Sequence, residues 1–260
     1  MNDVTAPAQD YVVAGGAKLE CLDIPGRAPD LPAIVLLHEG LGSVSLWRDV
    51  PDTVAAATGR RIFAYSRRGY GKSDPAPLPR PMTYLHDEAF LVLPEVLQVR
   101  RIERPILVGH SDGASIAILH AARHPVSGLV LMAPHVFVED LTVASVAEAK
   151  KAYETTDLRA RLARHHNDVD NAFRGWNDTW LDPAFRSWNI EAYLPQVTAP
   201  VLIIQGLEDQ YGTIAQVDAI ERQVRGPAQR LILSPCGHTP HRDRPAETLE
   251  AITKFIAGLT

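Results

Sequence analysis

The stretch that decides the fold is residues 105–124, PILVGHSDGASIAILHAARH. A short apolar run rich in β-branched residues ends at Gly109, and an Ala/Ile/Leu-rich stretch typical of a helix begins after Gly113. This order predicts a strand, a tight turn and a helix, with Ser111 at the tip of the turn. Glycines at both flanks allow the strand and the helix to approach each other. The Ser111 hydroxyl is therefore expected to project from the sheet.

The helix predicted after Ser111 points its N-terminus at the same spot. The N–H of Asp112 and the positive end of the helix dipole would then face a negative charge forming beside Ser111. A Gly-x-Ser-x-Gly pentapeptide by itself also arises by chance. The strand before it and the helix after it are the context that the motif requires. The stretch thus predicts a nucleophile and half of an oxyanion hole.

The rest of the chain predicts an α/β fold. Continuous apolar runs indicate strands buried on both faces, as in a parallel sheet covered by helices on both sides. These runs are Ala33–Leu37, Arg61–Tyr65, Pro105–Val108, Gly128–Met132, Val201–Ile204 and Arg230–Leu233. Helices are predicted between them at Leu46–Thr58, His86–Arg100, Ser111–Arg123, Thr213–Val224 and Ala246–Leu259. Before them, Tyr11–Val13 and Lys18–Asp23 alternate around Gly15-Gly16 and predict a hairpin.

One long interruption separates the runs that end near Met132 and begin at Val201. It contains three helical patterns, at Val143–Tyr153, Asp157–His166 and Val169–Leu181. An insertion of this length with its own secondary structure is usually functional. We therefore predict a core domain of residues 1–136 and 200–260, with residues 137–199 forming a helical cap.

Composition excludes several classes of function. The 260 residues carry a formal net charge of −5, which gives no general attraction for nucleic acid or anionic lipid. The two cysteines have no metal-ligand spacing and predict no disulfide framework. Residues Met1–Asp10 lack the features of an export signal, and no apolar stretch is long enough to span a membrane. A cytoplasmic protein is expected.

A serine hydroxyl needs a base to take its proton and a third group to orient that base. In a parallel sheet such groups come from loops at the carboxyl ends of later strands. Gly206-Leu207-Glu208-Asp209 follows one predicted strand, and Ser234-Pro235-Cys236-Gly237-His238 follows the last. The order along the chain is serine, acid, histidine.

With these motifs the chain resembles the α/β-hydrolase fold superfamily, in the capped branch that holds carboxylesterases, carbon–carbon bond hydrolases and perhydrolases. The matching pieces are His38–Ser43, Ser66–Asp74, Gly109–Gly113, Gly206–Asp209 and Gly237-His238. The resemblance implies a mostly parallel eight-stranded sheet with a cap inserted after strand six. It implies Ser111 as nucleophile, Asp209 as the acid and His238 as the base.

Each assignment has an alternative. Asp209 could merely cap the following helix, with Glu208 as the rival acid. His241 rivals His238, and the two together have the spacing of a metal pair, although no third ligand is suggested nearby. Similarly, His165-His166-Asn167-Asp168 is interpreted as a solvated helix end rather than a metal site.

The resemblance places the second oxyanion donor in the loop after the first buried strand. The N–H of Gly40 is expected to be that donor, with Leu41 as the alternative. Glu39 departs from the family pattern, in which glycine usually follows the histidine. A carboxylate pointing inward would oppose a developing negative charge, so Glu39 is predicted to turn away and pair with Arg67 or Arg68.

An apolar stripe runs along the last predicted helix of the cap, at Val169, Phe173, Trp176 and Trp180. This stripe is expected mainly to dock the cap on the core, with Trp176 and Trp180 sharing in the lining of an apolar substrate pocket. Trp47 is predicted to line the same pocket.

The sequence therefore predicts a serine hydrolase that cleaves carboxylic esters of small to medium, largely uncharged substrates through an acyl-enzyme. The alternatives are a carbon–carbon bond hydrolase of vinylogous diketones, a perhydrolase, and a ligand receptor that retains the fold. No cofactor or metal is expected. The expected partner is a small-molecule substrate, without nucleic acid or membrane, and a homodimer is compatible with the sequence.

Overall fold

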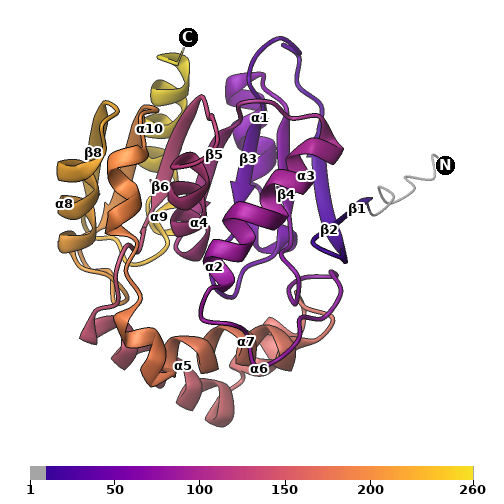
Figure 1. The fold of residues 1–260 in the computed structure, drawn as a ribbon, viewed down its shortest axis with the longest axis vertical. Helices are drawn as coiled ribbons and strands as arrows, with labels where there is room; N and C mark the ends of the chain where they lie inside the picture. Colours follow the sequence, from indigo (N-terminus) through magenta and orange to yellow (C-terminus); the bar gives the residue numbers. More distant parts are fainter. Residues whose placement is uncertain (1–9, 260) are drawn as a thin grey trace.

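The computed structural model describes residues 10–259, and one mixed sheet forms its centre (Figure 1). Its strands follow the order β1-β2-β4-β3-β5-β6-β7-β8, and all neighbouring pairs from β4 to β8 are parallel. The strands are β1 (Asp10–Ala14), β2 (Ala17–Ile24), β3 (Ile34–Leu37), β4 (Ile62–Tyr65), β5 (Ile106–His110), β6 (Gly128–Met132), β7 (Val201–Gly206) and β8 (Ala228–Leu233). The predicted α/β class and eight-stranded sheet are confirmed. The prediction that Met1–Asp10 carries no export signal concerns residues that, apart from Asp10, lie outside the described range.

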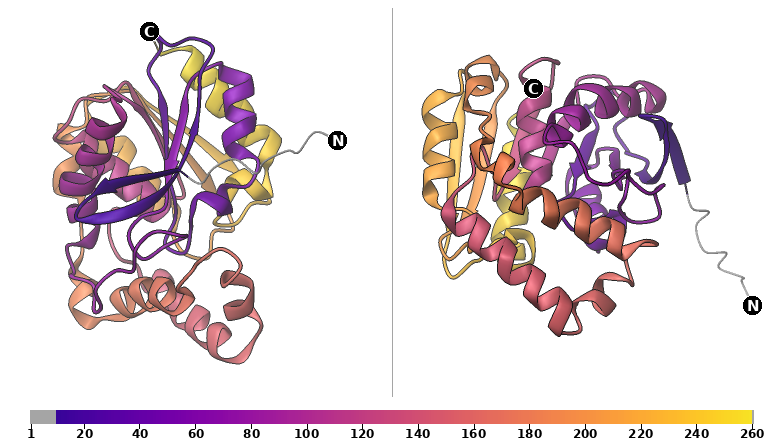
Figure 2. Two further views of the ribbon diagram at one scale, coloured as in Figure 1. Left: turned by 90° about the vertical axis from the view of Figure 1, so that its right-hand side faces the viewer. Right: turned by 60° about the horizontal axis from the view of Figure 1, so that its bottom comes forward.

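Helices cover both faces of the sheet because successive strand residues point to opposite sides. In β3, Val35 and Leu37 join one apolar cluster, and Ile34 and Leu36 join the other. Figure 2 shows these two layers on either side of the strands. The first layer contains α2 (Tyr84–Asp87), η2 (Glu88–Val92), α3 (Leu93–Arg100), α4 (Asp112–Ala121) and α8 (Ile214–Gln223). The second contains η1 (Val44–Trp47), α1 (Val50–Thr58), α9 (Pro240–Asp243) and α10 (Pro245–Ala257).

The inserted segment between β6 and β7 lies beyond the carboxyl ends of the strands, at the bottom of Figure 1. It comprises α5 (Asp140–Thr155), α6 (Leu158–Leu162), α7 (Val169–Leu181), η3 (Pro183–Ser187) and η4 (Glu191–Gln196). The sequence pattern located α7 at its observed bounds but did not indicate the two short turns η3 and η4. We call residues 137–199 the cap segment. Among residues 10–259, no helix is both long and apolar enough to cross a bilayer.

Candidate active site

Ser111 occupies a strained turn between β5 and α4. Its φ of 52° lies in the left-handed region that non-glycine residues rarely adopt, at a cost of about 1–3 kcal/mol. The flanking glycines explain how the turn is possible. A Cβ on Gly113 would lie 1.9 Å from the Leu37 carbonyl oxygen, and one on Gly109 would lie 2.4 Å from the Gly113 oxygen. The strand and the helix therefore meet backbone to backbone, and Ser111 is held at the edge of the sheet as predicted.

The structure brings His238 and Asp209 together beside this turn. His238 Nδ1 lies 2.8 Å from Asp209 Oδ2 and 2.9 Å from Oδ1. The Asp209 carboxylate also accepts hydrogen bonds from the Tyr211 N–H and from Gln205 Nε2. Burial alone would raise the pKa of Asp209, but the hydrogen bonds from His238 and Tyr211 outweigh it and lower that pKa. Asp209 is thus an ionised acceptor that orients the imidazole.

The rival residues lie elsewhere. The exposed Glu208 accepts hydrogen bonds from Ser234 Oγ at 2.7 Å and the Cys236 N–H at 2.8 Å. His241 is buried between Trp47 and His110, with ring centroids 5.3 and 5.0 Å away. In the part of the chain that the structure describes, no group of three potential ligands could hold a metal ion. Geometry therefore favours Asp209 and His238 over their alternatives.

The two residues predicted to supply the oxyanion donors both lie near Ser111. Gly40 and Asp112 both line the cavity that contains Ser111 and His238. The N–H of Asp112 is the first of its helix, so it has no acceptor within α4. The Asp112 side chain is fully buried, with Oδ2 3.4 Å from both Nη1 and Nη2 of Arg67. The ion pair with Arg67 therefore neutralises the side-chain carboxylate of Asp112, the residue whose backbone N–H is a predicted oxyanion donor.

Glu39 does not pair with an arginine, in contrast to the prediction. Arg67 reaches only the Glu39 carbonyl oxygen, at 2.9 Å, because its guanidinium is engaged with Asp112. The Glu39 carboxylate instead lies 3.5 Å from His110 Nδ1, and Glu39 is one of the residues that line the cavity. Burial opposes ionisation of Glu39, but the contact with His110 keeps its pKa below the usual range. The residue before Gly40, the predicted oxyanion donor, is therefore an anion.

The cavity over Ser111 has a volume of about 100 Å³. Trp176 and Trp180 of α7 line it, where the sequence predicts a substrate pocket, and so does Leu41, the alternative oxyanion donor. Trp47 does not. It is 2% exposed and packs in the second-layer cluster near His241, on the face of the sheet away from the cavity. The prediction for Trp47 is wrong because its side chain packs into the apolar cluster of the second helix layer, next to His241.

The sequence did not predict four further residues that line the cavity: His135, Thr142, Val146 and Tyr211. His135 follows β6 at the same edge of the sheet as Ser111, so its position after a strand was the available signal. Burial and the nearby His238 lower the pKa of His135 to about 3, and its ring is neutral at pH 7. Thr142 and Val146 belong to α5, and the sequence did not indicate which side of this helix points toward the cavity.

The interpretation of His165–Asp168 as a solvated helix end is also incorrect for one residue. His166 is only 4% exposed. Its Nδ1 accepts a hydrogen bond from the Gly71 N–H at 2.9 Å, so its Nε2 carries the proton and donates to the Leu41 carbonyl oxygen at 3.0 Å. Asp168 accepts a hydrogen bond from the Asn171 N–H and caps α7. The cap segment is therefore bonded directly to the loop that contains Gly40.

Known proteins similar to this chain differ in what their names say they act on. A proline iminopeptidase from Lactobacillus crispatus (strain ST1) is 35% identical and covers 90% of this chain and 92% of its own. The sn-1-specific diacylglycerol lipase ABHD11 of Mus musculus is 24% identical, covering 87% of this chain and 81% of its own. The enol-lactonase from Burkholderia xenovorans LB400 superposes with a TM-score of 0.74 at 20% identity, covering 95% of this chain and 100% of its own.

The region that matches a known protein family begins at the first parallel strand, β3, and ends within the last helix, α10. Ser111, Asp209 and His238 all lie inside it, as do the two candidate oxyanion donors. Residues 34–251 match the Alpha/beta hydrolase family, and the chain belongs to this family of hydrolases.

Proposed function

We propose that this hydrolase cleaves carboxylic esters of small to medium, largely uncharged substrates through an acyl-enzyme on Ser111. The observation that carries the proposal is the convergence of four groups on one cavity. These are Ser111 at its turn, His238 oriented by Asp209, and the residues Gly40 and Asp112, whose N–H groups are the proposed oxyanion donors.

Each group has a role that follows from its contacts. His238 Nδ1–H donates to Asp209, which leaves Nε2 as the acceptor for the Ser111 proton. Ser111 Oγ then attacks the ester carbonyl carbon, and the N–H groups of Gly40 and Asp112 hold the oxyanion. Each such donor is worth about 2.7–4 kcal/mol of transition-state stabilisation. His238 returns the proton to the departing alcohol, and water releases the acyl group by the same steps.

The cavity supports an uncharged substrate. Its lining, as far as residues 10–259 supply it, contains no lysine or arginine and includes the anionic Glu39. A substrate carboxylate would meet repulsion there. This disfavours cleavage of a vinylogous diketone held by its carboxylate. Trp176, Trp180 and Val146 offer apolar surface for a small acyl or alcohol group.

A second candidate is removal of an N-terminal proline from peptides. It is favoured by the 35% identity to a proline iminopeptidase. The Glu39 carboxylate at the cavity would suit the cationic amino group of such a substrate.

A substrate panel separates these activities. It contains p-nitrophenyl esters graded by acyl length, one vinylogous diketone and prolyl p-nitroanilide. We expect the short neutral esters to be turned over fastest, and Ser111→Ala to lower that rate by up to about 10⁶. Faster cleavage of the anilide or the diketone would replace the ester proposal. Binding without turnover of any substrate would identify a ligand receptor.

A further inference from the structure

Two tryptophans of α7 lie one helical turn apart, and each reaches a different oxyanion donor. Trp176 contacts the backbone of Gly40, and Trp180 connects to Asp112 through Tyr84. Both donors belong to the core, whereas α7 belongs to the cap segment. This juxtaposition suggests that the cap segment does more than enclose the substrate.

The Trp176 contact with Gly40 is a steric one. A Cβ added to Gly40 would lie 2.3 Å from both Cδ1 and Nε1 of the Trp176 indole. The ring therefore lies flush against the glycine and leaves no room for a side chain. Because Trp176 is only 7% exposed and packs against Phe173, the ring itself cannot easily move away. The Trp176 ring therefore prevents the Gly40 backbone from moving toward the cap segment.

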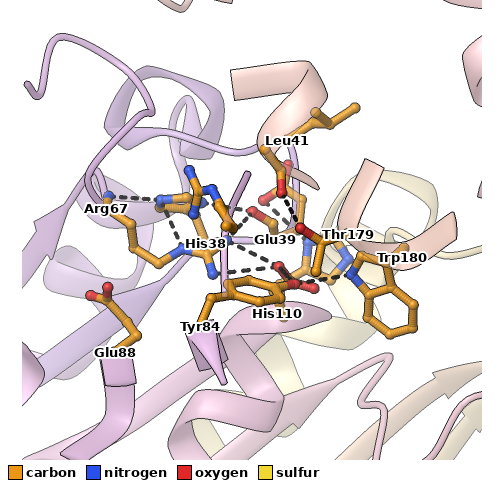
Figure 3. A network of polar contacts seen from close by, with 12 residues as sticks. His38, Glu39, Leu41, Arg67, Tyr84, Glu88, His110, Thr179 and Trp180 are labelled. Atoms are coloured by element: carbon orange, nitrogen blue, oxygen red, sulfur yellow. Dashed lines mark hydrogen bonds and ion pairs between the residues drawn. The ribbon is translucent and has the colours of Figure 1, made fainter. Parts of the chain in front are cut away.

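The Trp180 connection is a directed chain of hydrogen bonds (Figure 3). Trp180 Nε1–H donates to the Tyr84 phenol oxygen at 3.0 Å, and the Tyr84 O–H donates to Asp112 Oδ2 at 2.8 Å. All three side chains are buried. Burial, reinforced by the Asp112 carboxylate, raises the pKa of Tyr84 well above its ordinary value. The phenol therefore stays protonated and can only donate toward Asp112.

A third contact joins the same loop to the cap segment. His166, three residues before α7, donates from Nε2 to the Leu41 carbonyl oxygen next to Gly40. The loop with the first donor is thus held at two adjacent residues, and the residue with the second donor is held through its side chain.

We propose that the cap segment positions the oxyanion hole: Trp176 fixes Gly40, and Trp180, acting through Tyr84, fixes Asp112. Trp180 and Tyr84 are positioning residues, since they act on the donor through another side chain. The inference rests on the proposed ester hydrolysis. It goes further by making α7 part of the machinery that stabilises the transition state. A donor must lie within hydrogen-bond distance of the oxyanion to act, so a small displacement of Asp112 is expected to lower kcat.

A double-mutant cycle tests the connection. Tyr84→Phe removes a single oxygen atom, and Trp180→Phe removes the indole N–H. We expect each variant to lower kcat for the best short ester about tenfold. KM should change little in Tyr84→Phe, because the ground-state ester does not need the hole. Trp180→Phe also alters the cavity lining, so its effect is judged on kcat. The double variant should be no slower than Tyr84→Phe alone, since the Trp180 effect passes through the Tyr84 oxygen. Binding of a trifluoromethyl ketone, whose adduct places an oxyanion in the hole, should weaken by the same factor as kcat/KM.

Trp188→Phe is the matched control. Trp188 lies 5.9 Å from Trp180 in the same aromatic cluster, and its indole nitrogen has no hydrogen-bond partner within residues 10–259. The substitution leaves a similar cavity but breaks no link to Asp112, so kcat should stay within about twofold of wild type.

Three results would overturn the inference. They are full activity of Trp180→Phe, multiplicative effects in the double variant, and a loss in Trp188→Phe equal to that in Trp180→Phe. If Ser111→Ala retained turnover, the proposed function itself would fail. If ester hydrolysis depended on Ser111 but the Tyr84 and Trp180 substitutions acted independently, only the role of the cap segment would be refuted.

Discussion

At the scale of single residues, Asp209 is set apart from its neighbour Glu208 by what each carboxylate accepts. Asp209 is 7% exposed and accepts a hydrogen bond from His238 Nδ1–H. Glu208 is exposed and accepts hydrogen bonds from two groups in the loop at 234–236. The net lowering of the Asp209 pKa means that the carboxylate is charged whenever His238 carries the reaction. In the proposed mechanism, this charge stabilises the imidazolium that forms on His238 in the transition state.

Asp209→Asn is therefore expected to lower kcat by about 10⁴, because an amide fixes the wrong imidazole tautomer. Glu208→Gln should leave kcat within about twofold. Steady-state kinetics on the best ester from pH 5 to 9 measures both variants. A larger loss in Glu208→Gln than in Asp209→Asn would reverse the assignment of the acid.

His110 supports the same site from behind. Its Nε2 lies 2.7 Å from the His238 carbonyl oxygen and its Nδ1 faces Glu39. A carbonyl oxygen only accepts hydrogen bonds, so His110 Nε2–H donates to the His238 carbonyl oxygen. The ring thereby bridges the loop of the base and the loop of Gly40. The sequence placed His110 beside Ser111 but gave no sign of these partners, which come from the two loops after β3 and β8.

At the scale of elements, the turn between β5 and α4 depends on the closeness of α4 to β3. The Leu37 carbonyl oxygen occupies the space that a side chain at 113 would need. The turn cannot relax without moving the helix, and the helix carries the Asp112 N–H. The conformation of the Ser111 turn therefore depends on how closely α4 packs against β3.

Gly113→Ala should destabilise the protein by about 3 kcal/mol or prevent its folding, because overpacking forces the backbone to shift. Gly258→Ala is the matched control, since its added Cβ would meet its nearest atom at an ordinary 3.4 Å. Urea unfolding at pH 7 measures both, and equal stability of the two variants would contradict the close approach of α4 and β3.

At the scale of the whole molecule, the pattern of buried strands was enough to predict the sheet, and the glycine-flanked serine was enough to predict the turn. These features are local in sequence. Which loops meet over the turn is not local, and there the predictions were less accurate. Trp47 and Trp180 look alike as isolated apolar residues, yet one packs behind the sheet and the other over the cavity. Similarly, His166 looked polar and exposed because its two partners, Gly71 and Leu41, are about a hundred residues away in sequence.

The folded protein also buries several neutral histidines, which makes its stability depend on pH. Burial lowers the pKa of His120 to about 4, although its hydrogen bond to the Ala89 carbonyl opposes this. The unfolded chain binds a proton there below about pH 6.5, while the native protein does not until about pH 4. Stability is therefore lost as the pH falls from about 6.5 toward 4.

His120→Gln keeps a donor for the Ala89 carbonyl but does not titrate. The loss of unfolding free energy between pH 7 and pH 5 should be smaller in this variant by about 2 kcal/mol. Urea unfolding at the two pH values gives this difference. An unchanged difference would show that His120 is not held neutral in the fold.

A fluorophosphonate tests most directly whether Ser111 is the nucleophile of this site. The reagent should form one covalent adduct per chain, mapped by peptide mass spectrometry to Ser111, and ester hydrolysis should fall in proportion to labelling. Labelling should disappear in Ser111→Ala and slow by several orders of magnitude in His238→Ala. Ester turnover that continues in fully labelled protein, or an adduct on any other residue, would contradict the account.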